Sequence, residues 1–247
     1  MPGSILTGLC VCTLLGFPLE AAQQEASPPA LRAVTRTLYT PSTELFLEFR
    51  PLIVGEETRL TAHLTRVGER FRPYAEGSVK LTLTVDAVTA EAAAAAPERA
   101  GVFRLNVAAK KAGTGRIVLD LMATTGVQHF VINDVPVFVD AQAAQSTQLP
   151  EEMGLIAYAK ERSWEQDFAT AAVTVAFGGV ARIITVPLTA VMRDGDTACV
   201  FVQRTFERFE WREVKTRRTI GNAIEITSGL REGERIVVRG TEQMPRQ

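Results

Sequence analysis

The chain is poor in the residues from which catalytic sites are usually built. It has three cysteines and two histidines among 247 residues, and the histidines, His63 and His129, are far apart in the sequence. The Gly-x-Ser-x-Gly nucleophile elbow, the His-Glu-x-x-His zinc motif and the phosphate-binding loop are all missing. Carboxylates are frequent, but they mostly alternate with basic residues, as in residues 231–235, which is typical of solvated turns. The sequence therefore predicts a protein that is not an enzyme and holds no cofactor.

Cysteine is too scarce for a framework of disulfides. Cys10 and Cys12 lie in the first apolar run of the chain, so Cys199 is the one cysteine outside it. Cys199 stands inside the apolar run Ala198–Val202. We interpret it as a buried free thiol that packs as a small hydrophobic residue.

Neither sign of charge is in excess. The chain has 27 Lys and Arg residues against 28 Asp and Glu residues, and basic residues gather only in pairs such as Lys110-Lys111 and Arg217-Arg218. Proteins that bind nucleic acid or an anionic membrane surface usually carry a basic excess or a dense basic patch. The balance of charge therefore gives no indication of either partner.

Long apolar runs are missing as well, except for one near the N-terminus. Residues 5–17 are almost all apolar, but this run is shorter than the about 20 residues that cross a bilayer. Its length suits the apolar part of an export signal, and Ala21-Ala22 offers a cleavage point. We therefore predict a signal peptide over residues 1–22. Cys10 leaves a lipid anchor as an alternative, although Leu9 stands where a small residue is usual.

Short runs with the two-residue alternation of β-strands are abundant. The clearest is Val79–Asp86, in which apolar residues alternate with charged residues and threonines. Turn-forming residues separate the runs, and Ile132–Asp134 is one of the predicted turns. Other strands are predicted over residues 44–49, 59–65, 101–107, 116–122 and 129–139. This spacing predicts an antiparallel, immunoglobulin-like β-sandwich over residues 42–141, without the Cys-Trp-Cys core of true immunoglobulin domains.

Two linkers divide the rest of the chain. Residues 23–41 are polar and contain prolines, so we predict a linker there. We predict a second linker over residues 142–170, with a short helix around Lys160–Gln166. The alanine run Ala92–Ala96 is expected to be either a helical turn or a loop between strands. Residues 171–247 combine β-branched runs with glycine turns, which predicts a small C-terminal β domain and a mainly β fold with little helix.

Only a few residues are candidate ligands for a metal ion. Met122 and His129 are close in sequence and could meet across a hairpin, and Met153 stands at the end of a linker, where a flexible side chain could pass on an ion. Thioether and imidazole groups suit Cu(I) or Ag(I). The alternative is that Met122 is a core residue and His129 a half-buried strand residue. Both interpretations stay open at this point.

Three stretches, in this order, resemble the periplasmic adaptor subunits of RND-type efflux pumps, also called membrane fusion proteins, in their heavy-metal branch. Strand-like fragments within residues 44–79 are similar to the N-terminal β domain of some of these adaptors. Lys160–Trp164, followed by Asp167–Thr170, is similar to a Lys-Glu-Gln-Gln-Trp segment that comes after that domain. Val186–Gly240 resembles the end of the family's β-barrel together with its membrane-proximal domain.

The resemblance implies a non-enzymatic subunit in the periplasm, associated with the inner membrane. Such a subunit binds the inner-membrane RND pump and other adaptor copies through β surfaces and supports export, with heavy-metal cations as the expected substrate class. The lipoyl-like halves and the long α-helical hairpin of the family have no counterpart, because fewer than about 20 residues separate Phe168 from Val186 and no heptad pattern occurs. Contact with an outer-membrane channel, which belongs to the hairpin tip, is therefore not expected. A barrel without these strands should have an exposed edge over residues 172–180.

Two alternatives remain beside the adaptor. One is a small periplasmic metal-binding or carrier protein that uses Met122, His129 or Met153. The other is a deletion product of a full adaptor that has no activity, in which residues 171–184 would be poorly packed.

Overall fold

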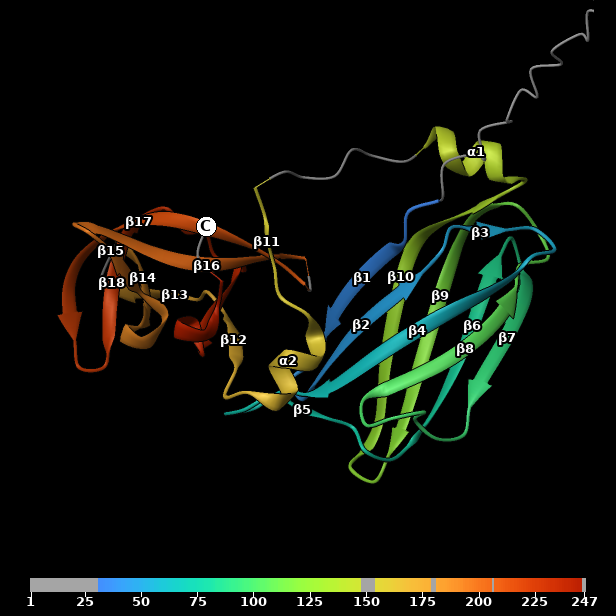
Figure 1. The fold of residues 1–247 in the computed structure, drawn as a ribbon, viewed down its shortest axis with the longest axis horizontal. Helices are drawn as coiled ribbons and strands as arrows, with labels where there is room; N and C mark the ends of the chain where they lie inside the picture. Colours follow the sequence, from blue (N-terminus) through green and yellow to red (C-terminus); the bar gives the residue numbers. More distant parts are fainter. Residues whose placement is uncertain (1–30, 148–153, 179–180, 206, 246–247) are drawn as a thin grey trace, which may run out of the picture. The chain divides into compact units, whose positions relative to one another are not determined.

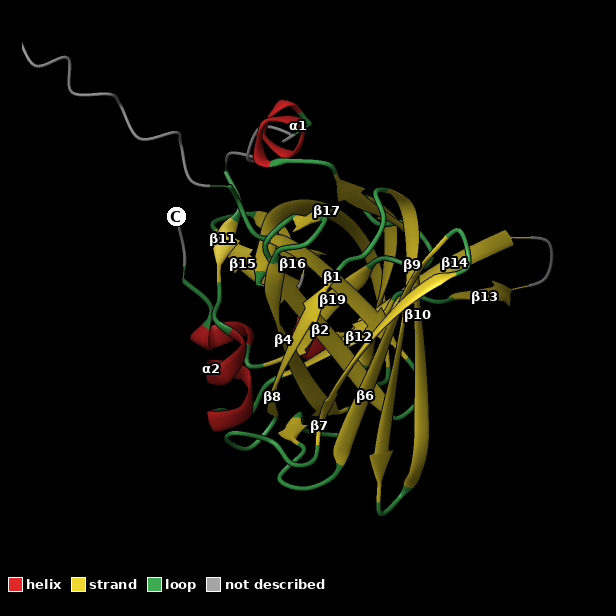
Figure 2. Cartoon of the chain, turned by 90° about the vertical axis from the view of Figure 1, so that its right-hand side faces the viewer, coloured by secondary structure: helices red, strands yellow, loops and turns green. Residues whose placement is uncertain are grey.

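The computed structural model describes residues 31–147, 154–178, 181–205 and 207–245. Within these ranges the chain forms nineteen β-strands, two short α-helices and two 3-10 turns, and strands dominate Figure 2. The predicted mainly β fold with little helix is therefore confirmed. Among the described residues, no helix combines the length and the apolar character that crossing a membrane requires. The predicted signal peptide and Cys10 lie outside the described residues.

Two five-stranded sheets form the N-terminal sandwich (Figure 1). The first has the order β1-β2-β4-β5, with β8 also paired to β4, and the second has the order β3-β10-β9-β6-β7. Neighbouring strands are antiparallel except for β3 and β10, which are parallel. The strand bounds are β1 Val34–Tyr39, β2 Thr43–Phe49, β3 Leu52–Ile53, β4 Glu57–Arg66, β5 Arg72–Pro73, β6 Ser78–Val85, β7 Val88–Ala94, β8 Val102–Ala108, β9 Gly113–Ala123 and β10 Gly126–Phe138.

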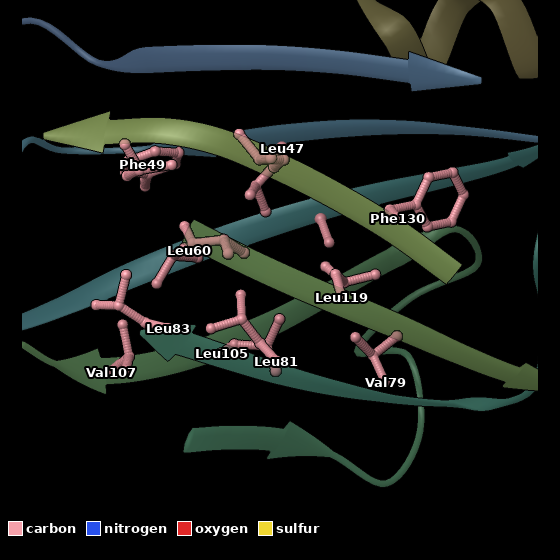
Figure 3. Close-up of a cluster of buried hydrophobic side chains, with 14 of the residues drawn as sticks. Leu47, Phe49, Leu60, Val79, Leu81, Leu83, Leu105, Val107, Leu119 and Phe130 are labelled. Atoms are coloured by element: carbon pink, nitrogen blue, oxygen red, sulfur yellow. The ribbon is translucent and has the colours of Figure 1, made fainter. Parts of the chain in front are cut away.

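The two sheets bury their facing sides in one core (Figure 3). On β6, every second residue from Val79 to Val85 is buried, as the sequence alternation predicts. Leu47 and Leu60 of the first sheet pack in the same cluster as Leu81 and Leu119 of the second. Each sheet thus covers the apolar face of the other, which gives the sandwich a core of its own.

The predicted linker over residues 23–41 is wrong in its last part. Val34–Tyr39 form strand β1, which pairs with β2 along its whole length. Val34 and Leu38 pack against the sandwich core, but Arg36 lies between them on the same face. Because a charged residue stands between two apolar ones on the same face, the sequence of β1 lacks the clear apolar–polar alternation by which a strand is predicted.

The alanine run is neither a helical turn nor a loop in its first part, because Ala92–Ala94 belong to strand β7. They pair with Leu81, Lys80 and Val79 of β6. Ala92 and Ala94 also pack against the sandwich core. Alanine prefers helices in isolated peptides, but pairing with an existing strand and burial of one face outweigh this weak local preference.

The predicted turn at Ile132–Asp134 is also wrong, because strand β10 continues through it. The pairing of β10 with β9 shifts its register between Ile132 and Val135, and Asp134 has a φ of 55°. The turn-forming residues therefore produce a β-bulge rather than a chain reversal.

A nine-stranded sheet forms the C-terminal part of the chain. Its order is β12-β19-β16-β17-β18-β14-β13, with β11 added beside β17 and β15 beside β16. Within the described residues β13 pairs with β14 alone, so it is an edge strand in the region where an exposed edge was expected. The bounds are β11 Ile156–Ala157, β12 Ala169–Ala172, β13 Val175–Gly178, β14 Ala181–Pro187, β15 Met192–Asp194, β16 Thr197–Thr205, β17 Arg208–Ile220, β18 Ala223–Ser228 and β19 Arg235–Arg239.

The predicted second linker, residues 142–170, contains ordered elements. Helix α1, Ala141–Ser146, begins after Asp140, whose side chain accepts a hydrogen bond from the Ala143 backbone N–H at 2.8 Å. Helix α2, Lys160–Glu165, lies where a short helix was expected. Several residues of this stretch are buried, so the described part of the predicted linker is packed against the sheets rather than solvated.

Candidate functional site

The structure brings two of the three candidate metal ligands to one surface. Met122 of β9 and His129 of β10 lie on the outer face of the second sandwich sheet, and both are exposed. Met153 lies outside the described residues. Among the described residues, no group of three or more His, Cys, Asp and Glu side chains is placed to hold a metal ion. A site at Met122 and His129 would therefore need the methionine sulfur, and it stays a prediction.

The second histidine of the chain is in a different environment. His63 of β4 is only 6% exposed, and its ring lies 5.3 Å from that of Phe46 and 6.1 Å from that of Trp164, between ring centroids. Burial lowers the pKa of His63 to about 4, because desolvation disfavours the imidazolium more than the nearby Glu161 carboxylate favours it. His63 is therefore a neutral packing residue at pH 7.

A buried ion pair connects the sandwich to helix α2. Lys160 Nζ lies 2.6 Å from Glu44 Oε2, and neither side chain is exposed to solvent. Tyr39 Oη donates a hydrogen bond to the other carboxylate oxygen at 2.7 Å. Burial lowers the pKa of Lys160 to about 8, although Glu44 favours the charged form. The ammonium is thus still the main form at pH 7 and neutralises a carboxylate that no water reaches.

Trp164, one helical turn after Lys160, also packs α2 against the sandwich, and Lys160 Nζ lies 5.8 Å from the centroid of its ring. Its indole N–H donates to Thr65 Oγ1 of β4 at 2.8 Å. A Cβ added at Gly101 would lie 2.5 Å from Trp164 Cη2, so the indole rests directly on the glycine backbone, which has a φ of 80°. Only glycine tolerates both the positive φ and this close approach.

An aromatic cluster continues these contacts into the C-terminal sheet. Phe71, from the loop after β4, meets Phe168 edge to face at 6.0 Å between centroids, and its backbone N–H donates to the Phe168 carbonyl at 3.2 Å. Phe168 stacks on Tyr158 at 4.9 Å and packs edge to face on Phe209 of β17. We call the ion pair, the Trp164 contacts and this cluster the junction. It joins the two sheet systems through buried side chains rather than through a solvated linker.

Sequence reasoning missed most of the junction. It singled out Lys160–Trp164 as a family-like segment, but it gave Lys160 no partner and treated Glu44 as an ordinary polar residue of an alternating strand. A signal was present, because Leu45, Leu47 and Phe49 already occupy one face of β2 and Glu44 stands on the other face with Phe46. That second face is also buried, although a strand with one face in water would carry polar, exposed residues there. The large apolar Phe46 beside Glu44 is the sequence signal that both faces of β2 are covered.

A charged network organises the surface of the C-terminal sheet. Arg212 of β17 donates to Glu234 at 2.8 Å and to Glu210 at 2.7 Å. Hydrogen bonds from Arg212 lower the pKa of the Glu210 carboxyl. Cys199, predicted to be a buried free thiol, is buried and free in this sheet. Arg212 and Glu234 thus hold the turn before β19 in place through their hydrogen bonds. Arg212, Glu210 and Glu234 include no nucleophilic side chain.

Comparison with protein families agrees with the C-terminal part of this fold. The family model of the CzcB C-terminal circularly permuted SH3-like domain matches residues 184–241, which run from within β14 to just after β19. This stretch is similar to the CzcB C-terminal domain family. The predicted resemblance to membrane fusion proteins of the heavy-metal branch is thereby confirmed. No curated protein sequence matches the chain.

Two solved structures resemble the chain at low identity. One is the NMR structure of a 180-residue segment of SilB from Cupriavidus metallidurans CH34 with its N-terminal metal-binding site and membrane proximal domain: 22% identity and a TM-score of 0.26 over 48% of this chain. The other is the crystal structure of ZneB from Cupriavidus metallidurans: 14% identity and a TM-score of 0.23 over 74% of this chain. The matches span 59% of the SilB segment and 40% of ZneB.

Proposed function

We propose that this protein is an adaptor-like subunit of an RND-type efflux system in the periplasm, held at the inner membrane. In this proposal it binds the inner-membrane pump and other adaptor copies, and it supports the export of heavy-metal cations. The observation that carries the proposal is the match of residues 184–241 to the CzcB C-terminal domain. The role is one of protein contact, and it requires no catalytic residue and no cofactor.

The junction supports this role physically. An adaptor has to transmit a contact made by one domain to the rest of the chain, and a solvated linker does this poorly. Here Lys160 and Glu44 form a fully buried ion pair between α2 and the sandwich, and Phe71 of the sandwich packs against Phe168. A pump contact made by the C-terminal sheet would therefore also orient the sandwich.

The tip of the β17–β18 hairpin is the surface that we assign to the pump. Ile220 and Leu188 are 49% and 42% exposed. The Leu188 backbone N–H donates to the Asn222 carbonyl at 2.9 Å, so Leu188 stands beside the hairpin turn. Ile220 pairs with Ala223, which in turn pairs with Pro187, and these residues form one apolar row. An exposed apolar row of this kind is typical of a protein contact surface.

Co-purification tests the proposal. The full chain, tagged and expressed with its RND pump, should be recovered with the pump trimer from membranes. Ile220→Glu should reduce this recovery about tenfold, because a carboxylate at the centre of a contact would have to be desolvated without a partner. The matched control is Val88→Glu, since Val88 is 38% exposed but belongs to the sandwich. Recovery of the native chain only as a free soluble monomer would overturn the proposal, and full recovery of Ile220→Glu would overturn the choice of surface.

The described part of residues 171–184 argues against an inactive deletion product. Val173 is 3% exposed and belongs to the core of the C-terminal sheet, and Ile184 packs against the same core. The Val173 backbone N–H and carbonyl form hydrogen bonds with Glu234 and Gly233 at 2.7 and 2.9 Å. The side chains of residues 176–182 lie outside the described part of the chain.

A further inference from the structure

The outer face of the second sandwich sheet carries an aspartate, a histidine and a methionine on two adjacent strands. His129 of β10 pairs directly with Asp120 of β9, and Met122 lies two residues further along β9. Residues that pair directly, and residues two apart on one strand, share a face of the sheet. Their neighbours Leu119 and Phe130 point into the core (Figure 3). Asp120, Met122 and His129 therefore all point to the outer side.

Asp120 already holds the imidazole in the orientation that a metal ion needs. His129 Nδ1 lies within hydrogen-bond distance of Asp120 Oδ1, and the histidine side chain is 58% exposed. A carboxylate can only accept, so in the neutral imidazole Nδ1 carries the proton and Nε2 has the lone pair that a metal ion can take. Histidines that bind metal ions are commonly oriented by a carboxylate in this way.

We propose that His129 and Met122 bind a soft monovalent cation, Cu(I) or Ag(I), and that Asp120 positions the imidazole. Diagonal neighbours across two antiparallel strands are about 7–8 Å apart, a span that an imidazole and a long thioether bridge through one ion. Met122 is 40% exposed, and its sulfur lies 3.9 Å from Ser78 Oγ of β6, the neighbour of β9 on the side away from β10. To bind an ion with His129 the flexible thioether has to turn across β9, which its three rotatable bonds and its exposure allow. This site does not depend on the proposed pump contact.

The donor set selects for soft cations. Zinc sites usually have four nitrogen, oxygen or sulfur ligands, and calcium and magnesium require several oxygens. One imidazole and one thioether instead match the preference of Cu(I) and Ag(I). Lys80, a cation on the adjacent strand β6, pairs with Asp120 in register, but its Nζ lies 3.0 Å from Glu91 Oε1. Its charge is therefore largely compensated by that glutamate.

Titration with Ag(I), followed by NMR, tests the site in the full chain. Cys10 and Cys12 are replaced by serine, because their thiols would compete for the ion. In a chloride-free buffer, the imidazole signals of His129 and the methyl signal of Met122 should shift together and saturate near one equivalent. The signals of His63 serve as an internal control and should stay in place, because this imidazole is buried.

Variants decide which residues bind the ion. His129→Gln and Met122→Leu should each weaken Ag(I) binding at least tenfold, and Asp120→Asn about tenfold, which is typical of a residue that positions a ligand. Met192→Leu is the matched control and should bind as tightly as the parent chain. The proposal is overturned if His129 does not respond up to about 1 mM Ag(I). It is also overturned if Met122→Leu binds like the parent, or if Zn(II) binds more tightly than Ag(I).

Discussion

Replacing Lys160 by methionine, while Glu44 keeps its carboxylate, should destabilise the folded protein strongly. Methionine has a similar length and retains much of the packing beside Phe71, so the variant removes little besides the charge. Lys160 Nζ and Glu44 Oε2 are 2.6 Å apart, and neither side chain is exposed. The substitution would leave a buried carboxylate without its cation, which is among the most destabilising single changes available in this fold.

The magnitude follows from this burial. Removing one partner of a buried ion pair usually costs about 3–5 kcal/mol, because the remaining charge has neither water nor a counter-ion. Glu44 keeps the hydrogen bond from Tyr39 Oη at 2.7 Å. We therefore expect a loss near the lower end, about 3 kcal/mol. Adding Glu44→Gln removes the unpaired charge, so the double variant should lie within about 1 kcal/mol of the native chain.

The assay is urea unfolding of the full chain at pH 7. Circular dichroism reports on the strands, fluorescence reports on the tryptophans, and linear extrapolation gives the free energy of unfolding. Glu44→Gln alone completes the double-mutant cycle. Lys111→Met is the matched control, because Lys111 Nζ lies 3.1 Å from Asp86 Oδ2 at the surface. Loss of that exposed pair should change the free energy of unfolding by less than about 1 kcal/mol.

Two results would refute this reasoning. A loss of less than about 1 kcal/mol in Lys160→Met would mean that the pair is solvated rather than buried. A double variant as unstable as Lys160→Met would mean that the loss comes from packing and not from the unpaired carboxylate.

Two further predictions concern the same region. Acid should destabilise the protein through His63, because burial lowers the pKa of this imidazole from 6.5 to about 4. The unfolded chain then binds the proton first, so the free energy of unfolding should fall as the pH drops from 6.5 to 4, by up to about 3 kcal/mol. In urea unfolding at a series of pH values, His63→Phe should lose this part of the pH dependence, and an unchanged dependence would contradict the prediction. Gly101→Ala should cost about 2–4 kcal/mol, since its φ is positive and its Cβ would collide with Trp164. Gly55→Ala has a similar φ of 78° but open space, so a thermal unfolding experiment in which both variants lose equal stability would argue against the packing role of Trp164.

Much of the sandwich was predictable because strand alternation is a local property. The alternation of Val79–Asp86 places one side of β6 in the core whatever its neighbours are. The mainly β character of the C-terminal part was also predictable from local patterns. Its β-branched runs and glycine turns agree with the match of residues 184–241 to an SH3-like domain. Local patterns were misleading where one residue broke them, as Arg36 does in β1, or where pairing outweighed a propensity, as in Ala92–Ala94.

The sequence by itself determined which faces of the strands are apolar and that the last third of the chain is a small β domain. Only the tertiary structure decided which polar residues meet. Lys160 and Glu44 are 116 positions apart, and Asp120 supports His129 only because the register of β9 and β10 sets them opposite each other. The physical reason is that burial of apolar faces depends on residue type and spacing, whereas a specific polar contact depends on how distant segments are aligned by the whole fold.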